Sequence, residues 1–526
     1  MRLLKKIAMW LLGILLLLVL LNYGVSWWIT KNLPSIIHKE KDFPYNVSYK
    51  DLDLSIINGS FTMHDVYLAP KDSTLAALKQ GAFGEIKTIN VQHFNLWALL
   101  REERIKVKRI VIDSPDIILY EKDKKYNVED DVSKPFRNIV NTGSLEVRNG
   151  KFRMFDNKLN PLIKSANINL EINNIKLDSA IVESNIPVRY TDYKFKCDSL
   201  FYKIDNVYNI VAQNVHSTES TITVNNLKLI PKYNRAQYTR SLKKEKDLFT
   251  VEVKKLNLPK VEWGYYRDTL FVHAPRLELD NLAANIYRNK EVADDPSRKK
   301  LYSEALRDLD FDLKIDRLIM RNSYIQYEEQ VDFSKPPAIV SFSKFYANIT
   351  NVYSAVNKKK IPTTVSNVQC LFMNVSPLQV TWTFNVPDAS DSFTIKGHLQ
   401  NLQSRNLNKL SLPLMNIASD SDIKEVKFTI NGNNNFATGN FAIDYDNMKV
   451  TIYRKDGKKK NKFMTAVGNL LVKNDSNDKL KQADIQVARL KDKSVFNFLW
   501  RCLQEGLKQT LLPKAVSAVL PKGGKK

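Results

Sequence analysis

A repeated pattern of alternating apolar and polar residues restricts the fold of this chain more than any other feature. Ile105–Glu121 and Leu313–Glu329 align without a gap, and their apolar positions coincide. Val140–Asp156 follows the same pattern, and Leu52–Asp65 is a weaker copy. Each copy has two stretches of period two around Ser-Pro, Asn-Ser or Asn-Gly. Side chains alternate between the faces of a strand, and Asn-Gly accepts a tight turn, so each copy is predicted to be a hairpin with one apolar face.

The apolar faces of these units must be shielded from water. Two packed sheets would cover each other, whereas a single long curved sheet would leave a groove for helices or for a ligand such as lipid chains. The periodicity leaves both arrangements open. In the open arrangement, the groove is predicted to be lined by Ile110, Ile112, Ile117, Leu119, Leu145, Val147, Phe152, Leu318, Met320, Ile325 and Tyr327.

The composition favours strands throughout the body of the chain. Gly (16) and Pro (19) are scarce among the 526 residues, and Val, Ile, Thr, Tyr and Phe are frequent. We therefore expect a mainly β protein, built as an elongated curved antiparallel sheet of repeated hairpins with an apolar concave face. Helical spacing is confined to Phe94–Arg104, Ser297–Leu309 and Ser494–Leu520, and the last of these predicts a C-terminal amphipathic helix.

The N-terminal segment is predicted to be a transmembrane signal-anchor. The 24 residues from Ile7 to Thr30 carry no charge, and as a helix they would span about 36 Å. A cleaved signal peptide is the alternative, but its apolar region would be shorter. Basic residues before the segment place the N-terminus in the cytoplasm. The predicted anchor residues are Leu11, Leu15, Leu18, Trp27 and Trp28.

The net charge of +24 predicts an anionic partner, such as lipid headgroups. Two basic runs stand out, Lys243–Lys246 and Lys455–Lys462. The second is most simply a solvated hairpin loop, and contact with headgroups through Lys458, Lys459 and Lys460 is the functional alternative. The predicted export of the body argues against a nucleic-acid partner.

The sequence offers no motif for catalysis. It contains no phosphate-binding glycine motif, no nucleophile elbow and no paired zinc-ligand histidines. Its three cysteines, Cys197, Cys370 and Cys502, lie far apart and allow at most one disulfide. We therefore expect no enzyme, no catalytic residue, no metal and no cofactor, although residues distant in sequence could still form an active site.

Both ends of the body resemble the AsmA-like envelope proteins of Gram-negative bacteria. The resemblance rests on Tyr45–Ala69, Gly84–Tyr120 and Leu410–Tyr453. It implies a single-pass bacterial inner-membrane protein with a periplasmic body, related to TamB-type and bridge-like lipid-transfer proteins. The predicted organisation is a cytoplasmic tip (1–6), the anchor (7–30), an N-terminal AsmA-like β region (31–160), a middle β region (161–300), a C-terminal AsmA-like β region (301–490) and the C-terminal helix with a basic tail (491–526).

Two functions are compatible with this organisation. By the resemblance, the protein would bind phospholipid or transfer it between the inner and outer membranes, and so support outer-membrane biogenesis. Alternatively, it would be a structural or assembly factor whose sheet edge pairs with a strand of an outer-membrane or other envelope protein.

Overall fold

The computed structural model describes residues 45–55, 58–94, 105–121, 140–176, 189–266, 268–358, 360–454, 462, 465, 475–477 and 479–512. The predicted anchor, the predicted helix after Phe94 and the tail after Leu512 lie outside these residues. Within the described part of the chain, no helix has the length and apolar character needed to cross a membrane.

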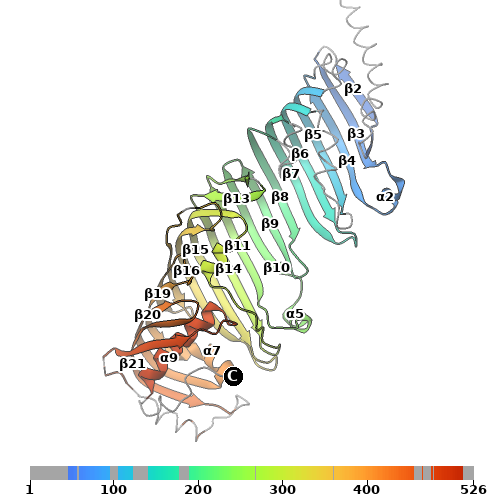
Figure 1. Ribbon diagram of the computed structural model, residues 1–526. Coiled ribbons are helices and arrows are strands. Elements are labelled where there is room, and N and C mark those ends of the chain that lie inside the picture. The colour runs from blue at the N-terminus through green and yellow to red at the C-terminus, as the bar shows by residue number, and fades with distance from the viewer. Residues whose placement is uncertain are drawn as a thin grey trace, which may run out of the picture. The chain divides into compact units, whose positions relative to one another are not determined.

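The chain divides into two compact units, and its strands belong to one mixed sheet of 22 strands (Figure 1). Unit 1 comprises residues 1–205 and 210–224, and unit 2 comprises residues 206–209 and 225–526. The first elements are β1 (Tyr45–Ser48), β2 (Asp51–Ser55), β3 (Ser60–Pro70), α2 (Ser73–Ala77), β4 (Gly81–Gln92), β5 (Ile105–Tyr120), β6 (Val140–Phe155), β7 (Pro161–Lys176) and β8 (Asp192–Lys203), followed by β9 (Tyr208–Thr218) and β10 (Thr221–Pro231), which straddle the boundary between the units.

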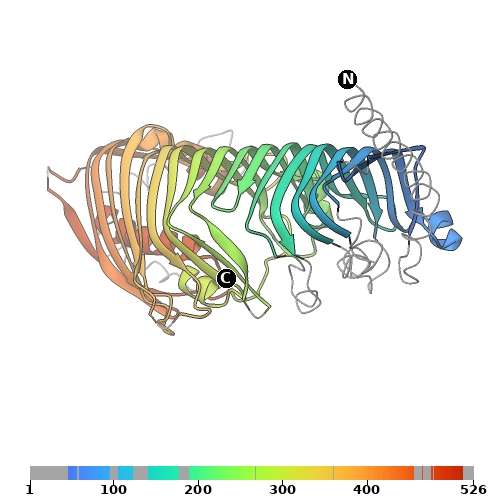
Figure 2. The ribbon, with the colours of Figure 1, turned by 90° about the horizontal axis from the view of Figure 1, so that it is seen from above.

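Unit 2 contains the remaining strands and most of the helices. They are α5 (Arg235–Ser241), β11 (Leu248–Pro259), β12 (Glu262–Tyr266), β13 (Thr269–Ala274), β14 (Leu277–Asn289), α6 (Tyr302–Arg307), β15 (Asp312–Gln330), β16 (Ala338–Tyr353), β17 (Thr364–Phe372), β18 (Ser376–Phe384), β19 (Phe393–Gln403), η2 (Ser404–Leu407), α7 (Asn408–Met415), β20 (Ile417–Gly432), β21 (Phe436–Ile452), β22 (Lys481–Ala488) and α9 (Val495–Leu511). Figure 2 shows that the longer strands bend along their length.

The prediction of a purely antiparallel sheet is wrong. β5 and β6 pair in parallel, and β15 is parallel to both β13 and β14. The parallel pairing of β5 with β6 also explains the sequence repeat. Ile105 lies opposite Val140, so two copies of the repeat stand side by side in the register of their ungapped alignment.

The prediction that each copy is a hairpin is wrong for the three stronger copies. The first, second and third copies each form one long strand, β5, β15 and β6 respectively. Their central residues Ser114, Asn322 and Asn149 have φ values of 50°, 49° and 53° and occupy irregularities within the strands. Asn and Gly accept positive φ in a β-bulge as readily as in a turn, so the local signal was ambiguous. The fourth, weakest copy is a hairpin, formed by β2 and β3.

The predicted C-terminal helix is confirmed over Val495–Leu511, where it forms α9. The Ser494 side chain caps its start by accepting a hydrogen bond from the backbone N–H of Asn497 at 3.3 Å. Phe498 and Cys502 are buried in the largest core of unit 2, together with Phe441 and Ile443 of β21. The prediction over Ser297–Leu309 is confirmed in part, because α6 covers six of those residues.

Candidate functional site

Four rows of facing residues cross the strands of unit 1 and form an apolar face. Residues directly opposite each other in a sheet lie on the same face, so the strand register identifies each row. The rows are Phe61–Val91–Ile110–Leu145–Ile172–Tyr193, Met63–Ile89–Ile112–Val147–Leu170–Phe195, Leu68–Gly84–Ile117–Phe152–Ser165–Leu200 and Ala82–Leu119–Met154–Ile163–Tyr202.

Residues with positive φ keep these rows on one side of the sheet. Ile112 and Ile117 are five residues apart, and a regular strand would point them to opposite faces. The positive φ of Ser114 reverses the alternation without changing the register with β4 or β6, so that both stretches of β5 present their apolar residues to the same side. Asn149 does the same in β6, directly beside Ser114.

The apolar face of unit 1 is partly exposed. Ile110, Ile112 and Ile117 are only partly buried, and so are Leu145 and Phe152, whereas Leu119 is buried. Among the described residues of this unit, Phe94 packs against Val91 and Ile110 at one end of the rows, and no second sheet covers β4 to β8. The described part of unit 1 is therefore a single sheet with an accessible apolar side.

Unit 2 has equivalent rows. Leu318 lies between Leu277 and Ile349, and Met320 lies between Leu279 and Ala347. Beyond the bulge, two further rows are Ala284–Ile325–Phe342–Phe372 and Ile286–Tyr327–Val340. Leu318, Met320, Ile325 and Tyr327 are all partly exposed.

Helix α9 covers the far end of the same face in unit 2. The row through Leu318 continues by way of Trp382 of β18 to Ile395 of β19. Ile395 is buried in one cluster with Phe498 of α9, so the helix lies on the side of the sheet to which Leu318 belongs. The C-terminal helix therefore caps the sheet, a role that the sequence left open.

A crossover segment also lies over this face. Because β14 and β15 are parallel, residues 290–311 must return along the sheet before β15 begins. Leu301 in this segment is buried in the same core as α9, and the Tyr302 ring contacts that of Trp382 at 5.3 Å between centroids. At the start of α6, the hydroxyl of Ser303 donates a hydrogen bond to Asp391 at 2.8 Å.

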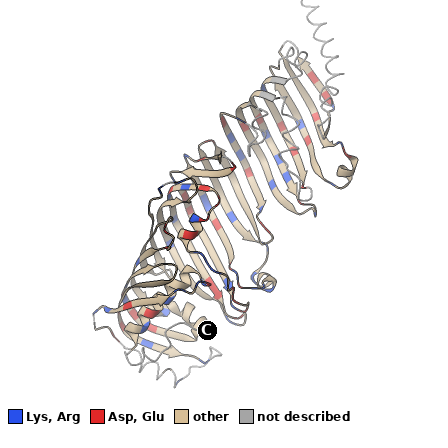
Figure 3. Cartoon of the chain, viewed as in Figure 1, with Lys and Arg blue, Asp and Glu red and all other residues tan. Residues whose placement is uncertain are grey.

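The opposite side of β5 and β6 carries charged residues in ion pairs. Figure 3 shows that basic and acidic residues are interspersed along the strands. In unit 1, Arg148 binds Glu146 at 2.6 Å, and Arg109 also reaches Glu146. Hydrogen bonds from Arg148 and Arg109 hold the pKa of the Glu146 carboxyl below its usual value, despite partial burial. These paired charges keep one side of the sheet polar and the other apolar.

All eleven predicted groove residues lie on these rows, and the structure separates them into two groups. Those of β5 and β6 form facing pairs in unit 1, and those of β15 belong to unit 2. Lys458, Lys459 and Lys460, like the five predicted anchor residues, lie outside the described residues. The prediction missed the partners on β4, β7 and β8, although alternation in Ile163–Ile172 could have revealed β7.

The described residues contain little that suggests catalysis. They include no group of three or more His, Cys, Asp or Glu placed to hold a metal ion. Cys197, Cys370 and Cys502 are buried free thiols, and burial raises the pKa of Cys370 to about 11 and that of Cys502 to about 12. These thiols therefore remain protonated at neutral pH and are poor nucleophiles.

No protein-family model matches the chain, and no curated protein matches it.

Proposed function

We propose that this protein binds the acyl chains of phospholipids on the apolar face of its sheet and transfers phospholipid between the inner and outer membranes of a bacterial envelope. The observation that carries the proposal is the set of continuous apolar rows with partly exposed side chains. Partly exposed apolar side chains that gather on one face are unfavourable in water and are typical of a binding surface. The proposal includes the N-terminal anchor, a periplasmic body and an apolar side that is concave.

Helix α9 supports the proposal from within the chain. Its buried side chains pack on the apolar face at one end of unit 2. This face can therefore bind another apolar surface, such as one side of a helix. An acyl chain is also apolar and needs no hydrogen bonds, so it can pack on the partly exposed apolar rows in the same way.

Lipid extraction from the gently purified full chain tests the proposal. Mass spectrometry should recover phospholipid at a fixed ratio to the protein, and photo-crosslinkable acyl chains should label peptides of β5, β6 or β15. Recovery of no lipid, or labels confined to the predicted anchor, would refute binding along the sheet.

The alternative role, pairing of a sheet edge with an outer-membrane protein, is less favoured at the C-terminal end. β22 pairs with β21 on one side, and on the other its carbonyl oxygens accept hydrogen bonds from α9. Gln509 donates to the carbonyl of Asp484 at 3.0 Å, and Arg501 donates to that of Ala488 at 2.7 Å. These carbonyls are therefore engaged and are not open to an added strand.

A further inference from the structure

We propose that the loop Leu242–Asp247 of unit 2 binds the phosphate headgroup of anionic phospholipids at the rim of the apolar face. This loop joins α5 to β11. The inference rests on the proposed lipid-binding function and specifies its substrate class. It assigns a headgroup site to a basic run other than the predicted Lys458–Lys460.

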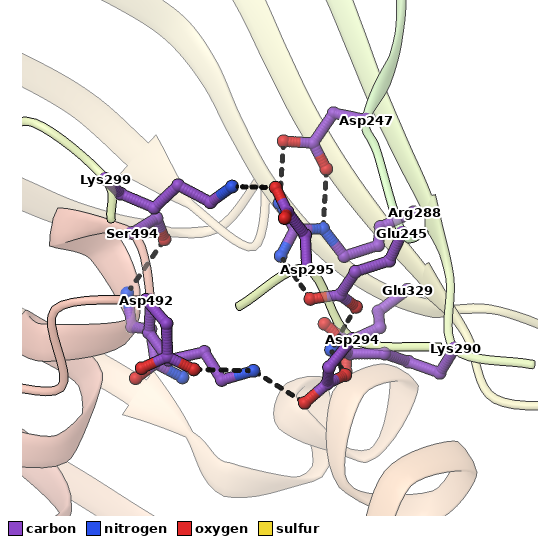
Figure 4. Close-up of polar contacts among 12 residues, drawn as sticks. Glu245, Asp247, Arg288, Lys290, Asp294, Asp295, Lys299, Glu329, Asp492 and Ser494 are labelled. Carbon is purple, nitrogen blue, oxygen red and sulfur yellow. Dashed lines mark hydrogen bonds and ion pairs between the residues drawn. The ribbon is translucent and has the colours of Figure 1, made fainter. Parts of the chain in front are cut away.

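A buried carboxylate holds the loop in place. Glu245 is 8% exposed, and it binds Lys290 at 2.7 Å and Arg288 at 3.6 Å (Figure 4). Its backbone N–H also donates to the carbonyl of Ala293 at 2.7 Å. This carboxylate of the loop is therefore turned inward and neutralised by Arg288 of β14 and by Lys290, which follows that strand.

The three lysines of the loop are available to a ligand. Lys243, Lys244 and Lys246 are exposed, and none of them forms an ion pair with another residue that the structure describes. Three unpaired lysines within four residues produce a local positive potential, which the inward-facing Glu245 does not cancel. Phosphate is the anion that such a cluster of lysine side chains suits.

The loop lies where the apolar face ends. The last apolar row near it is Ile286–Tyr327, and the next row along the same strands pairs Arg288 with Glu329. Asp247, at the end of the loop, accepts hydrogen bonds from Arg288 at 2.7 and 2.9 Å and fixes the loop to this charged row (Figure 4). A lipid with its chains on Ile286 and Tyr327 would therefore place its headgroup beside the loop.

The test compares two lipids with identical chains on the full-length protein in neutral detergent micelles. Dioleoyl phosphatidylglycerol carries a net negative charge, and dioleoyl phosphatidylcholine carries none. Native mass spectrometry gives the ratio of their occupancies. We expect the protein to prefer phosphatidylglycerol by at least tenfold, since each lysine near an anionic headgroup contributes about fivefold.

The triple variant Lys243→Gln, Lys244→Gln, Lys246→Gln should reduce this preference to about twofold or less while total lipid occupancy persists. The control variant Lys108→Gln, Lys158→Gln, Lys196→Gln removes the same charge from exposed positions of unit 1 and should retain the preference. An unchanged preference in the first variant, or an equal loss in the control, would overturn the headgroup site.

Two further outcomes distinguish a failure of the headgroup site from a failure of the proposed lipid-binding function. If no lipid of either kind binds the wild-type protein, the proposed function itself fails. If inorganic phosphate at millimolar concentration displaces phosphatidylglycerol completely and binds the loop without lipid, the cluster is a site for free anions, and the headgroup assignment is wrong.

Discussion

Ile110 of β5 and Leu145 of β6 face each other across two parallel strands, and they hold the same position in two copies of the sequence repeat. Two copies of the repeat thus lie side by side as neighbouring strands of the sheet. Each added strand extends the apolar rows by one residue, and none needs a partner sheet to do so. This relationship between sequence and register underlies the proposed binding surface.

Neighbouring residues of β5 provide a test of which face binds lipid. Ile117 lies in an apolar row with Gly84 and Phe152, whereas Ile118 points to the other side, opposite Arg153. Ile117→Glu should reduce co-purified lipid several-fold, because a charge on the apolar face disfavours acyl chains. Ile118→Glu is the matched control and should leave the lipid content near that of the wild type. Equal losses in two variants with unaltered circular dichroism would contradict the assignment.

Gly506 of α9 is predicted to be intolerant of a methyl group. A Cβ added there would lie 2.3 Å from Cγ of Phe441, so the helix would have to move off the sheet. Alanine ordinarily stabilises a helix by about 1 kcal/mol relative to glycine. We nevertheless expect Gly506→Ala to lower the free energy of unfolding of unit 2 by about 1–3 kcal/mol, as in overpacked cores.

Denaturant titration of the full chain measures this effect. The control, Gln504→Ala on the same helix, should change the free energy of unfolding by less than about 0.5 kcal/mol. A stabilised Gly506→Ala protein would show that α9 does not rest on Phe441.

The crossover segment depends on a buried carboxylate. Asp391 is 1% exposed and accepts hydrogen bonds from Ser303 at 2.8 Å and Arg307 at 2.9 Å, both in α6. Asp391→Ala leaves Arg307 without its charged partner and should cost about 3–5 kcal/mol of stability.

An exposed ion pair provides the comparison for Asp391. Asp294 binds Lys493 at 2.6 Å, but its side chain is 62% exposed. Asp294→Ala should therefore change stability by less than about 1 kcal/mol, because solvent screens the pair. Similar effects of the two substitutions in thermal unfolding would show that Asp391 does not anchor the segment.

The buried thiols predict a loss of stability at alkaline pH. Burial raises the pKa of Cys370 to about 11 and that of Cys502 to about 12, from 9.0. The unfolded chain releases these protons above pH 9, whereas the folded chain retains them. The contribution of the two thiols to the free energy of unfolding is therefore complete below pH 9. It is lost as the pH rises toward 11 to 12, at up to about 1.4 kcal/mol per pH unit and thiol.

Stability measured between pH 8 and about 10.5 should thus fall less steeply in Cys502→Ala than in the wild type. Iodoacetamide at pH 8 should leave all three thiols of the folded protein unmodified and should alkylate them in denaturant. Rapid alkylation of Cys502 in the folded protein would contradict its burial between α9 and the sheet.

The sequence by itself determined which residues are apolar on one side of a strand, where the C-terminal helix forms and that the regular strand is interrupted near Ser114, Asn149 and Asn322. These properties are local, because they depend on side-chain alternation, helical spacing and the tolerance of Asn and Gly for the left-handed region. The same local signals could not distinguish the bulge at Asn149 from a hairpin turn, since both need a residue with positive φ.

The tertiary structure decided what those local features become. Hydrogen bonds between strands far apart in sequence place Ile110 beside Leu145 in parallel, and the packing of Phe498 puts α9 on the apolar face. The burial of Glu245 against Lys290 turns an ordinary charge run into a cluster with one sign. Each outcome depends on a partner distant in the chain, so no local pattern could specify it.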